Sequence, residues 1–152
     1  MIRRTKLFFA LSPQERKLFL EAYIMLAFMR AAILTISFKR LTRFLHHSKD
    51  TIRPSALTGE QLHTAKCIGK AINQAMGNTP WKSACLAQAL TAQRMLKKRD
   101  ISGVFYLGVK KDKNAEEKMA AHAWLQCGES IITGEKGHEA FTILSVFGWG
   151  QR

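Results

Sequence analysis

Cysteine is scarce in this sequence, and its distribution excludes several kinds of protein. Cys67, Cys85 and Cys127 form an odd number of widely spaced thiols. A disulfide-stabilised secreted fold is therefore excluded, and we expect reduced thiols and a cytoplasmic location. The chain also lacks CxxC and HxxxH pairs despite its 5 histidines, which argues against a metal site. We expect neither a metal nor a cofactor.

Long uninterrupted apolar runs are also missing. The stretch 13–36 is rich in apolar residues, but Glu21 and Arg30 divide it into runs shorter than the roughly 20 residues that a membrane span needs. The basic N-terminus precedes an apolar run too short for a signal peptide. The stretch is predicted to form a buried or partner-facing helix. Because three basic residues follow it, a membrane-surface helix is the alternative. These residues are Lys39, Arg40 and Arg43.

Acidic residues are few, and the resulting positive charge is the most unusual feature of the composition. The 24 lysines and arginines outnumber the 11 acidic residues, giving a net charge of +13 over 152 residues. Such a surplus suggests nucleic acid, an anionic membrane or an acidic peptide as partner, or simply a solvated basic face. Interleaved aromatics typical of nucleic-acid binders are missing, so no nucleic acid is expected. A basic membrane- or nucleic-acid-binding module nevertheless remains an alternative function.

What is present predicts an α+β domain, with helices followed by a small antiparallel sheet. Capping boxes at Ser12–Glu15 and Thr58–Gln61 mark two helix starts. The expected helices cover 13–36, 58–76 and about 82–99, and the expected strands cover 103–109, 119–127, 130–133 and 141–147. The polar stretch 46–56 is predicted to be a linker. It divides the chain into an N-terminal basic and apolar helical region, 1–50, and a core, 51–152.

The stretch 79–90, TPWKSACLAQAL, indicates a candidate catalytic residue, because it places Cys85 in the first turn of a predicted helix. Backbone N–H groups and the helix dipole stabilise a thiolate there. His122, on a predicted strand, could accept the thiol proton as in a Cys–His hydrolase or acyltransferase. Trp81 and Trp124 could wall the cleft. The alternatives are a structural cysteine and a structural histidine. Cys67, expected to face the core, and Cys127 are predicted to be structural.

The motifs WKSACLAQAL, MLKKRDISGVFYLGV, AHAWLQ and FTILSVFG together resemble the lasso peptide biosynthesis B2 proteins. These belong to the transglutaminase-like cysteine protease superfamily. The resemblance covers about the last two-thirds of the chain, from Thr58 onward, and the basic helical beginning also resembles that family. It implies a papain-like protease core behind an N-terminal helical region. It further implies a bacterial leader peptidase that takes part in maturation of a ribosomally made peptide.

The resemblance also implies the partners. A B2-type enzyme cuts a lasso precursor between leader and core, and its substrates usually carry threonine at the penultimate leader position. A small B1-type leader-recognition protein presents the leader, and an ATP-dependent synthetase then closes the freed amine onto an aspartate or glutamate. This chain is expected to be the stand-alone type, without a fused recognition protein.

For the site, the resemblance implies Cys85 as nucleophile and His122 as base. The family commonly has an orienting aspartate about a dozen residues after the histidine, and this chain has none there. Glu135 is the nearest carboxylate, and Thr133 falls nearest the strand position. The missing aspartate leaves a catalytically inactive transglutaminase-like scaffold as an alternative.

Overall fold

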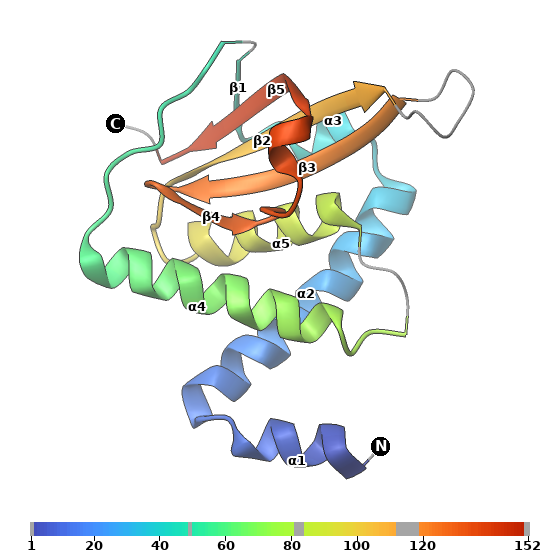
Figure 1. The fold of residues 1–152 in the computed structure, drawn as a ribbon, viewed down its shortest axis with the longest axis vertical. Coiled ribbons are helices and arrows are strands. Elements are labelled where there is room, and N and C mark those ends of the chain that lie inside the picture. The colour runs from blue at the N-terminus through green and yellow to red at the C-terminus, as the bar shows by residue number, and fades with distance from the viewer. Residues whose placement is uncertain (1, 49, 81–83, 112–118, 151–152) are drawn as a thin grey trace.

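The computed structural model describes residues 2–48, 50–80, 84–111 and 119–150 and has helices packed beneath an antiparallel sheet (Figure 1). This arrangement confirms the predicted α+β class. The described helices are α1 (Ile2–Ala10), α2 (Pro13–Thr35), α3 (Phe38–Leu41), α4 (Gly59–Met76), α5 (Cys85–Lys97) and the 3-10 helix η1 (His138–Ala140). The described strands are β1 (His46–Ser48), β2 (Gly103–Lys111), β3 (Met119–Cys127), β4 (Ser130–Thr133) and β5 (Thr142–Trp149).

Both predicted capping boxes are present at the starts of the long helices. At α2, the backbone N–H of Ser12 donates to the Glu15 carboxylate at 2.8 Å, and the N–H of Glu15 donates to the Ser12 hydroxyl at 3.2 Å. Thr58 and Gln61 make the same reciprocal pair at 3.0 and 3.1 Å at the start of α4. Each box satisfies two N–H groups that lack helical partners, which explains why the chain turns into a helix at these positions.

The strands are ordered β1-β5-β2-β3-β4 and all described pairings are antiparallel. The hairpin of β3 and β4 has the predicted bounds. Strand β1 was not predicted, because its residues lie in the stretch 46–56 that the sequence suggests is a linker. His46 to Ser48 pair with Gly148 to Val146 of β5 instead, forming a short edge strand.

The two faces of the sheet have different environments. The face toward the helices carries Phe105, Ala123 and Leu125, which share a buried cluster with residues of α2, α4 and α5. The opposite face carries a smaller cluster, whose buried members are Val104, Tyr106, Trp124 and Val146. This alternation follows from the two-residue period of a strand. The side of β3 on which each candidate residue lies follows from this alternation.

An ion pair and buried apolar contacts join α2 to the rest of the core. Leu26 of α2 is fully buried in the cluster that includes α4 and α5. The Arg99 guanidinium donates to both oxygens of Glu21, at 3.1 and 2.7 Å. The bond from Arg99 lowers the pKa of the Glu21 carboxyl, which keeps it ionised. Helix α2 is therefore an integral part of this core.

Candidate active site

Cys85 is the first residue of α5. The preceding residue, Ala84, has an extended backbone with φ −64° and ψ 152°, and its side chain cannot cap the helix. The helix thus begins later than the predicted start near residue 82; residues 81–83, including the proposed cleft residue Trp81, lie outside the described residues. The first N–H groups of a helix point along its axis without helical acceptors, so they can stabilise an anion at this end. Cys85 itself is half-buried against the core cluster.

His122 lies on β3 in an aromatic environment. Its ring stacks on Trp124 with centroids 5.8 Å apart and lies 5.0 Å from the ring centroid of Phe141. The residue opposite, on β2, is Gly108. A Cβ atom there would lie 2.8 Å from both Phe141 Cβ and Trp124 Cζ3, closer than side chains pack. The absence of a side chain at Gly108 therefore makes room for the rings beside His122.

The backbone carbonyl of Gly134 lies 2.7 Å from His122 Nε2. Because a carbonyl oxygen can only accept, the proton of this bond is on Nε2. In the neutral imidazole Nδ1 is then unprotonated and can act as a base. Gly134 lies twelve residues after His122, the place where the resemblance implies an aspartate. A backbone carbonyl thus makes the hydrogen bond to the imidazole that the resemblance implies for a carboxylate.

Glycine is required at 134 for two reasons. Its φ is +74°, a conformation that residues with a side chain rarely adopt. A Cβ atom there would also overlap the carbonyl oxygen of Ala123 and lie 2.9 Å from Trp124 Cα. The backbone of Gly134 thus approaches β3 closely, which brings its carbonyl within reach of the His122 ring.

The two residues proposed as third members flank Gly134, but neither contacts His122 within the described structure. Thr133 pairs with Leu125 and is 6% exposed, and its hydroxyl has no hydrogen-bond partner among the described residues. Glu135 is exposed, and its carboxylate makes no hydrogen bond or ion pair to a described residue. The Glu135 carbonyl instead accepts a bond of 2.6 Å from His138 Nδ1. Since β4 ends at Thr133, the chain turns between these residues and offers a backbone group to the ring.

The isolated hydroxyl of Thr133 leads to a stability prediction. Thr133→Val replaces the buried hydroxyl with a methyl group of similar size, so we expect about 1 kcal/mol of stabilisation, since a buried polar group without a partner is destabilising. Thermal unfolding should shift upward by about 2–4 °C. Thr142→Val on the exposed start of β5 is the matched control and should leave the midpoint unchanged. A lower midpoint for Thr133→Val would mean that the hydroxyl has a partner.

Cys85 and His122 are not in contact. No hydrogen bond joins them among the described residues, and they lie on different sides of β3. Cys85 packs against the helix-side cluster, whereas the His122 ring lies with Trp124 on the opposite face. Helix α5 nevertheless packs against β3, and in the view of Figure 1 the start of α5 lies beneath the first half of that strand.

The other two cysteines have different environments. Cys127 is fully buried, and its burial raises the pKa of the thiol to about 12, so it is structural as predicted. Cys67 is half-buried, and the prediction that it faces the core is wrong. Its Sγ lies 3.6 Å from Nε2 of His63, one helical turn earlier on α4. The cysteine–histidine contact of the described structure is therefore made by Cys67.

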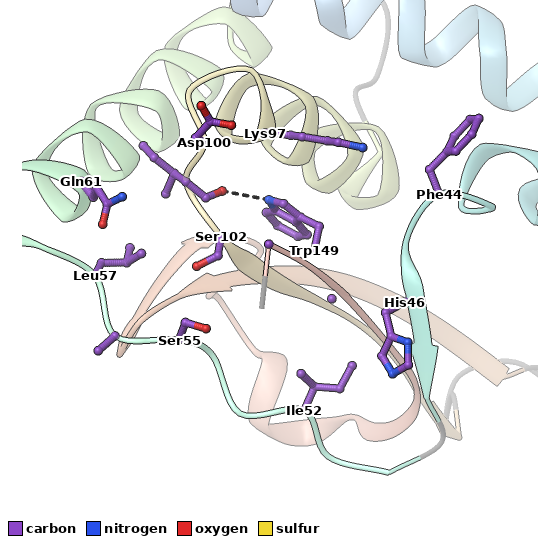
Figure 2. A pocket seen from close by; sticks show the side chains of 14 residues that line it. Phe44, His46, Ile52, Ser55, Leu57, Gln61, Lys97, Asp100, Ser102 and Trp149 are labelled. Carbon is purple, nitrogen blue, oxygen red and sulfur yellow. Dashed lines mark hydrogen bonds between the residues drawn. The ribbon is translucent and has the colours of Figure 1, made fainter. Parts of the chain in front are cut away.

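A cavity of about 1340 Å³ lies away from both candidate residues. It opens between the segment 52–57, the C-terminal end of α5 and the end of β5, where Trp149 Nε1 donates to the Ile101 carbonyl at 2.9 Å (Figure 2). Its lining residue Lys97 is the last residue of α5, about 18 Å along the helix from Cys85. In the described part of the chain, no three His, Cys, Asp or Glu side chains are grouped to hold a metal ion.

The family model of the transglutaminase-like superfamily matches residues 28–146. This span runs from the middle of α2 into β5 and includes Cys85, His122 and Gly134. No curated protein and no solved structure matches the chain.

Proposed function

Because the chain belongs to the transglutaminase-like superfamily, which includes cysteine proteases, we propose that it is a cysteine peptidase. Its proposed nucleophile is Cys85 and its proposed base is His122. The observation that carries the proposal is the hydrogen bond between His122 Nε2 and the Gly134 carbonyl, which leaves Nδ1 free to accept a proton. Cys85 at the uncapped start of α5 supports the nucleophile assignment.

The proposed reaction begins with activation of the thiol. His122 Nδ1 accepts the proton of Cys85 Sγ, and the thiolate attacks the carbonyl carbon of the scissile peptide bond. A C–S bond forms while the carbonyl π electrons move to oxygen. The N–H groups of the first turn of α5 are suited to stabilise that oxyanion, and each such donor is typically worth about 3 kcal/mol of the barrier.

The imidazolium then donates its proton to the leaving nitrogen, and the C–N bond breaks. This step frees the α-amine of the downstream fragment and leaves the upstream fragment as a thioester on Cys85. His122 next accepts a proton from water, whose oxygen attacks the thioester. The C–S bond breaks, the carboxylic acid leaves, and the thiol is restored.

The geometry requires His122 to move before it can reach Cys85. Strand β4 pairs with β3 only from Leu125 to Cys127, so β3 has no β4 partner at His122. The ring therefore lies beside a stretch of β3 without a β4 partner, and the proposed reaction requires it to turn around that edge toward the start of α5. Catalytic hydrogen bonds are often long without substrate and tighten when it binds.

For the substrate, we propose a lasso peptide precursor, cut between leader and core in the bacterial cytoplasm. The motif resemblance supports this, as does the chemistry, since the cut releases the α-amine that a separate ATP-dependent synthetase would close onto a side chain. A small B1-type leader-recognition protein is the proposed presenting partner. The net charge of +13 is compatible with an acidic leader.

Mass spectrometry of a precursor incubated with the enzyme and its leader-binding protein tests the proposal. We expect two fragments whose masses sum to that of the precursor plus one water. Replacing the penultimate leader threonine with aspartate should lower kcat/KM at least about tenfold, because a charge would then replace the neutral side chain that the resemblance implies at this position. An intact precursor, with partner present at saturation, would contradict the leader-peptidase proposal.

The separation of Cys85 from His122, together with the missing carboxylate, favours an inactive scaffold as the second candidate. Alkylation by iodoacetamide, followed by peptide mass mapping, distinguishes an active peptidase from an inactive scaffold. A catalytic Cys85 should react at least about tenfold faster than Cys67 at pH 7, since the thiolate is the reactive form. Under the scaffold reading the two half-buried thiols would react at similar rates and no precursor would be cut.

A further inference from the structure

We propose that the outward face of α2 binds the surface of an anionic lipid bilayer. The face consists of an apolar stripe formed by Leu20, Ile24, Phe28 and Leu34, which we call the outer stripe. The proposal concerns a docking surface that does not include Cys85, and it does not depend on peptidase activity.

The outer stripe is exposed although its side chains are large and apolar. The exposed fractions are 49% for Leu20, 66% for Ile24, 62% for Phe28 and 75% for Leu34. Spacings of four, four and six residues place them along one side of the helix. The opposite side of α2 is buried, through Ala22, Leu26, Met29 and Ala32. A helix that is apolar on both sides normally buries both, and the fold covers only one of them.

Helix α2 is long and apolar enough to cross a membrane by length and composition alone, a test that core helices also pass. A spanning position conflicts with the packing on its inner side. It would remove Leu26 from the cluster shared with α4 and α5 and would break the Glu21–Arg99 ion pair. Lying at the interface, with the outer stripe in the lipid and the inner side in the core, preserves both contacts.

Positive charge is placed at both ends of the outer stripe. Lys17 precedes it on the same side of α2, three residues before Leu20, and is exposed. Lys39 and Arg40 follow on α3 and are exposed too. Just beyond them the guanidinium of Arg43 lies 4.8 Å from the ring centroid of Phe44, which is 69% exposed. An aromatic ring beside basic groups is typical of the boundary between lipid headgroups and acyl chains.

The acidic residues of this region are directed away from the outer stripe. Before Asp50 the chain contains only Glu15 and Glu21. Glu15 accepts from the Ser12 backbone and pairs with Lys70 of α4 at 3.3 Å. Glu21 is bound by Arg99. The cations around the outer stripe thus face a partner without competing carboxylates, which favours an anionic surface.

Shape and chemistry favour lipid over other anionic partners. The residues of the outer stripe line neither the 1340 Å³ cavity nor the groove between α2 and α4. They form the side of a helix, and α1 and the first half of α2 project away from the sheet (Figure 1). Nucleic acid would offer phosphates to the basic ends but nothing for the apolar centre. A bilayer provides both anionic headgroups and an apolar interior.

Sedimentation of the full chain with vesicles tests the proposal. The vesicles are phosphatidylcholine alone, or phosphatidylcholine with about a quarter phosphatidylglycerol, in low salt. We expect the anionic vesicles to bind the protein and the neutral vesicles to bind it at least about tenfold more weakly. Ile24→Ser/Phe28→Ser should weaken anionic binding at least about tenfold by removing apolar insertion. Lys39→Glu/Arg40→Glu should weaken it similarly and reduce its salt dependence.

The control is Ile143→Ser/Leu144→Ser, which removes two apolar side chains, 46% and 60% exposed, from β5. It should bind like the wild type, and all variants should keep the wild-type melting temperature, since the substituted side chains are exposed. If the wild type and Ile24→Ser/Phe28→Ser bound anionic vesicles equally, charge attraction alone would explain the binding, and the proposal would be overturned. Failure of the wild type to bind anionic vesicles would overturn it too, as would self-association through the outer stripe in size-exclusion chromatography.

Discussion

The Cys85→Ala variant is expected to cleave precursor at least about a thousandfold more slowly than the wild type, because it lacks the sulfur that forms the proposed thioester. The substitution removes one sulfur atom from a half-buried position at the start of α5. The free energy of unfolding should therefore change by less than about 1 kcal/mol. Initial rates from mass spectrometry, together with a thermal melt, separate lost chemistry from lost fold.

Cys67→Ala is the matched control, and a demanding one, because Cys67 is the cysteine that contacts a histidine in the described structure. We expect it to keep its full rate. If Cys67→Ala were inactive while Cys85→Ala cut normally, the nucleophile would be on α4, and the catalytic assignment of Cys85 would be wrong. Loss of activity in both variants would require unfolding of one of them, which the melt detects.

The His122→Ala variant should lose about a thousandfold in kcat/KM, because the thiol would lack a base and the leaving amine an acid. The wild-type kcat/KM should depend on pH through this base, and that dependence should disappear in the variant. The hydrogen bond to Gly134 would also be lost, at roughly 1 kcal/mol of stability. The pH profile distinguishes a base from a histidine that only supports the fold.

Glu135→Gln is the control for the third member of the site. Since the Glu135 carboxylate contacts no described residue, we expect the variant to stay within about twofold of wild type. A loss as large as that of His122→Ala would instead mean that the carboxylate orients the imidazole when substrate binds. The Gly134 carbonyl would then have only a structural role.

Features set by neighbouring residues could be predicted from the sequence. The capping boxes at Ser12 and Thr58 involve partners three residues away, so the starts of α2 and α4 were predicted correctly. The hairpin 119–133 was also predicted with its observed bounds, since the alternation of its strands is a local signal. The presence of Cys85 in the first turn of its helix followed from the same kind of pattern.

Features that depend on distant partners could not be predicted. Strand β1 exists because His46–Ser48 pair with β5 about a hundred residues later, and a short polar segment carries no trace of that pairing. The position of Cys67 depends on how α4 is rotated against α2. The partner of His122 is a backbone oxygen, which every residue has. Side-chain chemistry alone therefore predicts Thr133 or Glu135 and not the glycine between them.

The Gly134 carbonyl has a consequence for how variation at this site would be interpreted. Natural or laboratory substitutions at 134 would destabilise the fold through backbone strain. This loss of stability would hide any separate effect on the imidazole. A saturation scan would therefore record an intolerant glycine next to the exposed and tolerant Glu135, the usual signature of a tight turn. Only a change to the carbonyl itself, such as a backbone ester introduced by chemical synthesis, would separate the two roles. An ester carbonyl accepts hydrogen bonds more weakly, so its effect would appear in the nitrogen NMR signals of the His122 ring.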